Sequence, residues 1–207
     1  MLSLGVLVSG TGTNLQSIQE AIADGRLNAT IRVVISNKPD APALERAREA
    51  SIPTLCLSHR DYPTRDAFDA ALVDALRRAS VEWVVLAGFM RILTRAMLDA
   101  FPSRVLNIHP SLLPAFPGVD AQHQAIEYGV KLAGCTVHLV DEGTDTGPII
   151  AQRGVPVLDS DDAVTLRARI LAEEHSLLVE VLRAISENRI EVMREGARRA
   201  RVRTRPA

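Results

Sequence analysis

Two polar side chains that could take part in catalysis lie two positions apart near the middle of the chain. The segment VLNIHP contains Asn107 and His109, and Pro110 follows directly. Residues two apart on a β-strand point to the same face, and a proline biases the preceding residue toward an extended backbone and ends the strand. An amide and an imidazole placed in this way can stabilise an oxyanion and move a proton. A histidine next to an apolar strand is also often a core residue, so the pair alone leaves both interpretations open.

A carboxylate that could complete this pair lies in the segment DEGTDTGP, which contains Asp145. The glycines and the proline are typical of a surface turn, which is the simpler interpretation. If the turn folds over His109, the carboxylate raises the pKa of the imidazole and keeps it protonated. Such a trio suits acyl or formyl transfer to an amine, because an oxyanion is stabilised and a proton is moved without a serine or cysteine nucleophile.

A third candidate is the loop SGTGTN, which runs from Ser9 to Asn14 after the first apolar run. A loop between a strand and a helix offers free backbone N–H groups at the positive end of the helix dipole, and its glycines let a phosphate approach closely. The loop lacks the third glycine of a dinucleotide fingerprint and the lysine of a P-loop, so NAD and ATP are poor candidates. A tight turn capped by Thr13 or Asn14 is the alternative.

The elements that would hold these segments alternate between strand and helix in the first half of the sequence. The strands are predicted at residues 2–8, 30–36, 54–57, 83–87 and 105–108. The helices are predicted after Asn14 and at residues 41–50, about 65–79 and 94–100. This alternation predicts an α/β fold, with a single-domain, mostly parallel twisted sheet and helices on both faces. Ligands bind such sheets at the carboxyl edge, where Asn107 and His109 are expected.

The second half changes character after Pro110. The segment NIHPSLLPAFPG is predicted to be an ordered loop, and a helix follows at about residues 121–128. Two apolar runs, 132–140 and 149–157, flank a turn-rich connection and predict an antiparallel strand pair. A long helix at about 161–188 and a short strand at 190–193 complete a predicted domain of residues 1–193. The basic segment 194–207 is predicted to be a flexible, solvated tail, and a contact with RNA or another polyanion is the alternative.

The overall composition favours a protein that acts on small molecules. The chain has 207 residues, 47% of them hydrophobic, and its 24 Lys and Arg nearly balance 25 Asp and Glu. This balance gives no reason to expect nucleic acid or an anionic membrane as a partner. The sequence shows neither a signal peptide nor a run of roughly 20 apolar residues, so a cytoplasmic protein is expected. Cys56 and Cys135 lack metal-binding spacing and are expected to be buried free thiols.

Four segments carry a family resemblance. They are SGTGTNLQ, VVLAGFMRIL, LNIHPSLLPAFPG and VHLVDEGTDTGPII. In this order and spacing they resemble the four signatures of the phosphoribosylglycinamide formyltransferase family, and the resemblance covers the chain from Leu4 to about Met193. It implies a Rossmann-like formyltransferase fold and a role in purine biosynthesis.

The resemblance also implies substrates and residue roles. The co-substrate 10-formyltetrahydrofolate would give its formyl group to the amino group of glycinamide ribonucleotide, with no metal. Asn107 would hydrogen-bond the formyl oxygen, protonated His109 would stabilise the oxyanion, and Asp145 would support His109 and relay the amine proton through water. The ribonucleotide would bind Gly12, Thr13, Asn14 and Glu174. The folate would bind Arg65, Met90, Arg91, Ile92, Leu93, Val140 and Asp141.

Several of these residues have structural alternatives, and the chain departs from the family pattern in two places. Glu174 could instead be a solvated helix charge paired with Arg169 or Arg167, and Arg65 a helix-surface arginine. The segment around Met90 could be a plain strand–helix junction. No role is transferred to His123, because the stretch after Gly118 differs from that of some members, and Thr146 stands where others have glycine. Both departures leave the trio complete.

Related enzyme classes share the Asn-x-His pair and a distant aspartate. Methionyl-tRNA formyltransferase carries an additional RNA-binding domain and formyltetrahydrofolate hydrolase an additional regulatory domain, for which 207 residues leave no room. A non-catalytic folate- or nucleotide-binding module with an arginine-rich tail is a different class, and it predicts loss of a trio residue. The sequence leaves monomer and homodimer open.

Overall fold

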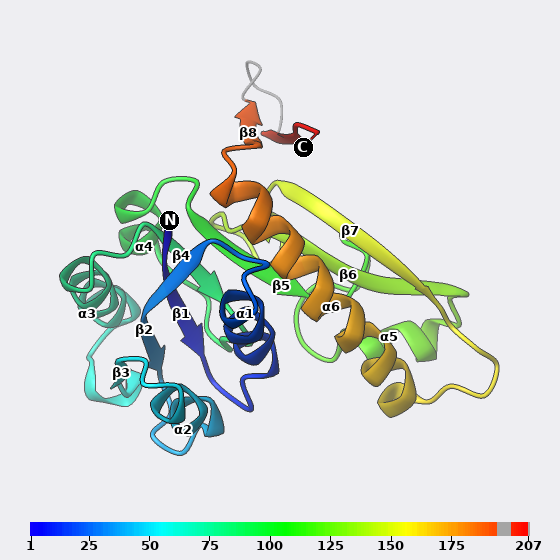
Figure 1. Ribbon diagram of the computed structural model, residues 1–207. Coiled ribbons are helices and arrows are strands. Elements are labelled where there is room, and N and C mark those ends of the chain that lie inside the picture. The colour runs from blue at the N-terminus through cyan, green and yellow to red at the C-terminus, as the bar shows by residue number, and fades with distance from the viewer. Residues whose placement is uncertain (194–199, 207) are drawn as a thin grey trace. The chain divides into compact units, whose positions relative to one another are not determined.

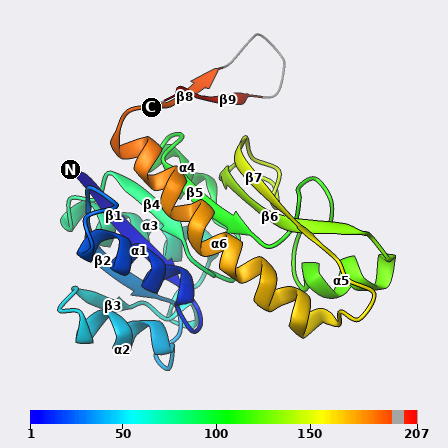
Figure 2. The same cartoon turned by 45° about the vertical axis from the view of Figure 1, so that its right-hand side comes forward.

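The computed structural model of the protein describes residues 1–193 and 200–206. The chain divides into two compact units, unit 1 (Met1–Asn107) and unit 2 (Ile108–Ala207). Each unit is described by itself below, and the ribbon in Figures 1 and 2 lets the reader follow the elements of each. The proposed domain boundary at residue 193 stays a prediction.

Unit 1 is a parallel sheet with helices on both faces, in the strand order β3-β2-β1-β4-β5. Helices α1 and α2 lie on one face of this sheet, and α3 and α4 lie on the other (Figures 1 and 2). The strands are β1 (Leu2–Val8), β2 (Ala29–Ser36), β3 (Thr54–Cys56), β4 (Trp83–Leu86) and β5 (Val105–His109), whose last two residues belong to unit 2. The helices are α1 (Thr13–Ala23), α2 (Pro42–Glu49), the 3-10 turn η1 (His59–Asp61), α3 (Arg65–Arg78) and α4 (Arg95–Ala100).

The central strands of unit 1 are buried on both faces, which explains their almost unbroken apolar sequences. Leu4, Val6 and Leu7 of β1 have no exposed surface, and Val84 and Val85 of β4 have none either. Helix α3 begins after Thr64, whose side-chain oxygen accepts a hydrogen bond from the Ala67 N–H and caps the helix. The carboxyl ends of these strands are thereby fixed by a rigid core.

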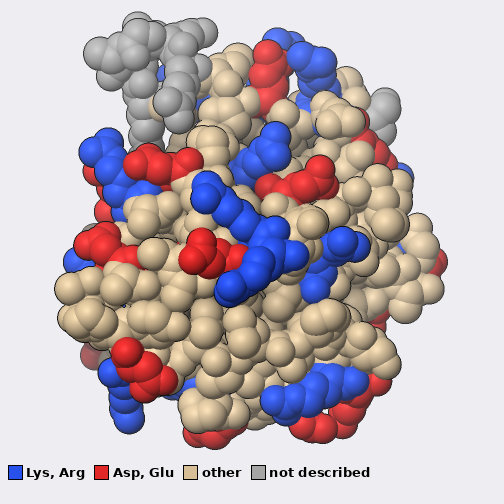
Figure 3. All heavy atoms as spheres, turned by 90° about the vertical axis from the view of Figure 1, so that its left-hand side faces the viewer, with Lys and Arg blue, Asp and Glu red and all other residues tan. Residues whose placement is uncertain are grey.

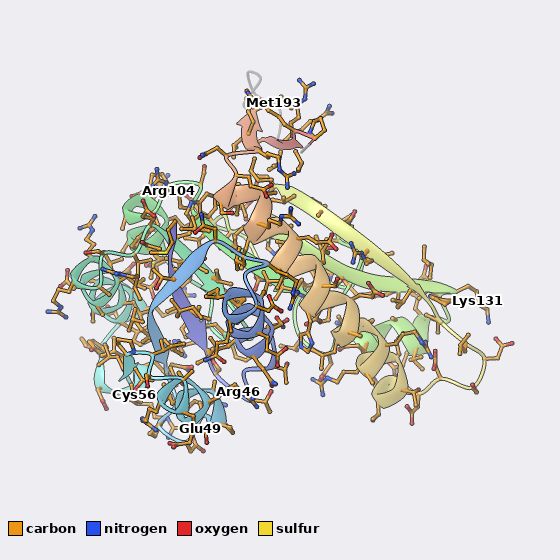
Figure 4. All side chains as sticks on the ribbon, viewed as in Figure 1. Arg46, Glu49, Cys56, Arg104, Lys131 and Met193 are labelled. Carbon is orange, nitrogen blue, oxygen red and sulfur yellow. The ribbon has the colours of Figure 1, made fainter. Side chains whose placement is uncertain are left out.

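Unit 2 is built on the antiparallel pair β6 (Leu132–Leu139) and β7 (Ile149–Pro156). The long helix α6 (Ala163–Ser186) packs against both strands and also contacts α5 (Ala121–Tyr128), as Figure 1 lets the reader follow. It starts with a capping box, in which the Asp162 side chain accepts the Thr165 N–H and the Thr165 side chain accepts the Asp162 N–H. The strands β8 (Ile190–Met193) and β9 (Arg201–Thr204) form a separate antiparallel pair. In Figure 4, Lys131 marks the start of β6 and Met193 the end of β8.

The predicted fold class is confirmed: a mostly parallel sheet, helices on both of its faces, and an antiparallel strand pair in the second half. Most predicted elements occur with ends shifted by one or two residues, and the last short strand, 190–193, is β8. Of the basic tail, residues 194–199 and 207 lie outside the described residues. Residues 201–204 of it form β9, opposite β8, and whether the tail is flexible stays a prediction.

The surface chemistry agrees with the balanced composition. On the face shown in Figure 3, basic and acidic side chains lie interspersed rather than gathered by sign. Both cysteines are free, as expected, but only Cys135 is buried, whereas Cys56 is exposed at the end of β3 (Figure 4). The expectation for Cys56 was wrong because the apolar run that contains it belongs to a short strand with a partly open side. In the described part of the chain, no helix is long and apolar enough to cross a membrane.

Candidate active site

The Ser9–Asn14 loop of unit 1 has the backbone of an anion site. Gly12 is the N-cap of α1 in the left-handed conformation, with φ 75°, and no side chain caps the helix. The first bond of the helix runs from the Gln16 N–H to the Gly12 carbonyl. The predicted residues Gly12, Thr13 and Asn14 lie at the N-terminus of α1, which is the positive end of the helix dipole.

Helix α2 contacts this loop and supports its backbone. The Ala43 N–H donates to the Gly10 carbonyl at 3.2 Å. A Cβ on Gly12 would lie only 2.6 Å from the Ala43 Cβ, so a glycine is required at this close approach as well as by its φ. One turn further along, the Arg46 Nη1 donates to the Gln16 Oε1 at 2.7 Å, and Figure 4 labels Arg46 on α2.

The segment after β4 contains the residues predicted to bind folate in unit 1. Met90 and Ile92 are exposed by 67% and 52%, whereas Leu93 is buried and anchors the segment. The buried Asp69 of α3 accepts the Thr94 N–H at 2.5 Å and so fixes the end of the segment before α4. The Arg91 guanidinium lies 5.6 Å from the centroid of the Phe68 ring, within cation–π range. Arg65 is exposed at the start of α3, which agrees both with a folate-binding residue and with a helix-surface arginine.

The catalytic candidates His109 and Asp145 contact each other in unit 2. His109 is only 4% exposed, and its Nδ1 lies 3.3 Å from an Asp145 carboxylate oxygen. Its Nε2 lies 2.8 Å from the Phe116 carbonyl oxygen, and the same Asp145 oxygen accepts the Gly118 N–H at 2.8 Å. Asp145 has φ 55° and Phe116 has φ 52°, so both partners of His109 are held in a strained backbone conformation. Asp145 lies at a bend between β6 and β7, and its carboxylate faces the imidazole.

A second buried histidine, His138 of β6, also faces this carboxylate, and sequence reasoning missed it. Its Nε2 lies 3.7 Å from the other Asp145 oxygen, and its Nδ1 lies 2.9 Å from the Leu139 carbonyl. Each oxygen of Asp145 thus faces one imidazole. The signal that could have found His138 is its place in an otherwise apolar strand, seven residues before Asp145.

Burial decides the pKa of His109. Loss of solvent lowers this pKa below the usual value and outweighs the Phe116 carbonyl and the Asp145 carboxylate, which raise it. Asp145 does raise the pKa of His109, as predicted, but the pKa is lowered overall because burial has the larger effect, and depth of burial is not visible in the sequence. For Asp145, burial raises the pKa, but hydrogen bonds from His138 and the Gly118 N–H and the nearby imidazoles leave it lowered overall.

These two shifts predict a loss of stability in acid. His109 binds its proton less readily when folded, so its contribution is complete above its usual pKa of 6.5 and is lost as the pH falls below it. The Asp145 contribution is lost only further down, as the pH falls through its lowered pKa. Between about pH 7 and pH 5, the melting temperature should therefore fall more steeply for the wild type than for His109→Gln, which has no proton to bind. Equal slopes in thermal melts would contradict the shift assigned to His109.

The remaining predicted residues occupy defined positions. Asn107 is partly buried in β5, where it pairs with Leu86 of β4. Glu174 is only 6% exposed on α6, and Arg169 pairs with Asp161 at 2.6 Å, so Glu174 is not a solvated charge paired with Arg169. In unit 2, Val140 and Asp141 directly follow β6 and are partly buried.

The departure at Thr146 has a structural consequence. The Thr146 hydroxyl donates to an Asp141 carboxylate oxygen at 2.6 Å, and the Gly143 N–H donates to the same oxygen at 3.1 Å. These two bonds close the turn that leads to Asp145.

Among the described residues, no group of three or more His, Cys, Asp or Glu could hold a metal ion.

Residues 3–182 match the formyl transferase family model, and the chain belongs to this family. Its relatives include enzymes of one particular activity. The chain is 47% identical over 190 residues to the phosphoribosylglycinamide formyltransferase of Mycobacterium tuberculosis H37Rv, a match that covers 92% of this chain and 87% of the relative. It is 53% identical to the solved glycinamide ribonucleotide transformylase 1 from Symbiobacterium toebii, with a TM-score of 0.93 over 99% of this chain and 94% of that one.

Longer relatives also contain a matching region. The trifunctional purine biosynthetic protein adenosine-3 of Drosophila melanogaster is 48% identical over 174 residues, which are 83% of this chain but only 13% of that protein. The chain thus spans a small part of these trifunctional relatives.

Proposed function

We propose that this protein transfers the formyl group of 10-formyltetrahydrofolate to the amino group of 5′-phosphoribosylglycinamide in purine biosynthesis. The products are formylglycinamide ribonucleotide and tetrahydrofolate. The observation that carries the proposal is the buried contact between His109 and Asp145 in a chain that belongs to the formyl transferase family. The activity is assigned to residues 1–193, acting in the cytoplasm on small molecules, without a nucleic-acid or membrane partner.

The reaction proceeds through a tetrahedral intermediate. The amine nitrogen attacks the formyl carbon, and the carbonyl π electrons move to the oxygen, where His109 and the Asn107 amide stabilise the negative charge. This growing charge raises the pKa of His109 and so counters the effect of burial when the proton is needed. Asp145 accepts the amine proton, which passes through water to N10 of the folate. The bond from the formyl carbon to N10 then breaks, and N10 keeps the electron pair.

The two substrates use different groups of residues. Gly12, Thr13 and Asn14 bind the phosphate through their N–H groups, and Glu174 binds the ribose hydroxyls. The exposed apolar side chains of Met90 and Ile92 suit the flat pterin ring, which also meets the backbone of Arg91 and Leu93. Arg65 binds the folate glutamate carboxylate, and Val140 and Asp141 flank the pterin.

Gly12 tests the phosphate assignment. Gly12→Ala should weaken ribonucleotide binding by about tenfold or more, because the new Cβ would press on Ala43 and shift the loop. Folate affinity, measured calorimetrically without ribonucleotide, should stay within about threefold. The matched control is Gly25→Ala, since Gly25 has φ 78° but nothing within 4 Å of an added Cβ. A loss confined to folate binding would place the phosphate elsewhere.

The proposal is tested by the absorbance change that accompanies deformylation of 10-formyltetrahydrofolate, with and without the ribonucleotide. Deformylation that requires the ribonucleotide is expected. Deformylation without it would indicate a hydrolase, and no reaction in either case would indicate a binding module.

A further inference from the structure

A buried hydrogen-bond chain in unit 1 takes no part in the chemistry described above. It links Ser9, at the start of the loop assigned to the phosphate, with Met90, in the segment assigned to folate. Its members follow β1, β2 and β4, which are neighbours in the sheet. The chain therefore joins two proposed subsites along one edge of unit 1.

Ser9 makes three hydrogen bonds in this connection. Its hydroxyl donates to the Asn37 Oδ1 at 2.6 Å and accepts the Met90 N–H at 2.9 Å. Its backbone N–H donates to the Gly88 carbonyl at 3.0 Å. Ser9 is 5% exposed and Asn37 is 4% exposed, so water does not compete for these bonds. A shift of the phosphate loop at Ser9 must therefore either move the Gly88–Met90 backbone or break buried hydrogen bonds.

Asn37 extends the chain to a second contact with the same segment. Its Nδ2 lies 3.3 Å from the His59 Nδ1, an assignment in which the amide donates and the imidazole accepts. The His59 ring packs edge-on against Phe68, and the Arg91 guanidinium lies over that same Phe68 ring. Asn37 is thus linked indirectly to the segment assigned to folate in two ways. One link runs through Ser9 to Met90, and the other runs through the rings of His59 and Phe68 to Arg91.

We propose that Ser9 and Asn37 are positioning residues that fix the two substrate subsites relative to each other. As a result, ribonucleotide and folate bind cooperatively. This inference rests on the proposed function, because it uses the assignment of the two subsites. A ligand that fixes the loop at one end of this buried chain of hydrogen bonds also restrains the segment at the other end, and so leaves less to be ordered by the second ligand. By linkage, each substrate then tightens the binding of the other by the same factor.

The test is the dissociation constant of the ribonucleotide, measured calorimetrically with and without saturating tetrahydrofolate, which carries no formyl group to transfer. In the full-length wild type, tetrahydrofolate should tighten ribonucleotide binding by about fivefold or more. In Ser9→Ala this ratio should approach one. Asn37→Ala should give the same result, and Ser9→Ala/Asn37→Ala should lower the ratio no further than either single variant.

The matched control is Ser36→Ala. Ser36 is also fully buried at the end of β2, but its hydroxyl bonds only to the Lys38 backbone. This variant loses a comparable buried hydroxyl and should keep the wild-type ratio. The proposal would be contradicted if tetrahydrofolate did not change ribonucleotide binding in the wild type. It would also be contradicted if the wild type and Ser9→Ala gave equal ratios while the variant had a lower melting temperature. Either result would mean that the hydrogen bonds of Ser9 and Asn37 only support the fold. Failure of the proposed function is distinguishable, because the wild type would then show no formyl transfer.

Discussion

His109→Ala is expected to lower kcat by about 10²–10³-fold, the range typical of the loss of one group that stabilises an oxyanion. The dissociation constant of the ribonucleotide should change by less than about threefold, because the interaction of His109 with the formyl oxygen strengthens only in the transition state. Steady-state kinetics and calorimetry on the same preparation give both numbers.

His109 is buried, so a fold control is needed alongside this variant. His123→Ala removes an exposed histidine that pairs with Glu127, and it should leave kcat unchanged. The His109→Ala protein could melt cooperatively and still lose ribonucleotide affinity by the same factor as kcat. That result would contradict the role assigned to this side chain.

Asp145→Asn is expected to reduce kcat by a comparable factor, up to about 10⁴-fold by analogy with other His–Asp pairs. The amide cannot take up the amine proton, and it cannot offer a negative charge to both imidazoles. Asparagine is nearly isosteric and tolerates the φ of 55° at this position, so the fold should persist. If the fold persists, a lower kcat in Asp145→Asn reports the lost carboxylate chemistry and not unfolding.

The effects of the two substitutions should not add. If Asp145 acts on the reaction partly through His109, the variant His109→Ala/Asp145→Asn should lose little more kcat than the worse single variant. Asp159→Asn, which alters an exposed carboxylate paired with Lys131, is the control. Multiplied losses in the double variant would mean that the two side chains act independently.

The parts of this protein that the sequence predicts are those governed by continuous patterns. The strand β4 is an unbroken apolar run and β1 an almost unbroken one, and α3 shows helical spacing, so each is recognisable without its neighbours. The contact between His109 and Asp145 was suggested by residue type and by the expected sheet edge. The combination of segments made the family resemblance specific.

The parts that were missed depend on contacts between distant residues. His138 occupies a strand position that looks like core, and only the folded turn brings Asp145 to it. The sign of the His109 pKa shift follows from burial, which the nearest charge does not reveal. The strand β9 consists of two arginines, a valine and a threonine and has little apolar character, so its pairing with β8 could not be predicted from its composition.

The most direct measurement of the central claim follows the transferred carbon itself. Wild-type protein is incubated with 10-formyltetrahydrofolate labelled with ¹³C in the formyl group and with 5′-phosphoribosylglycinamide, and the products are analysed by NMR. The account predicts that the label appears as a formamide on the ribonucleotide, and that this product is almost absent with His109→Ala. Label found only in free formate, or remaining on the folate, would contradict formyl transfer to the ribonucleotide amine.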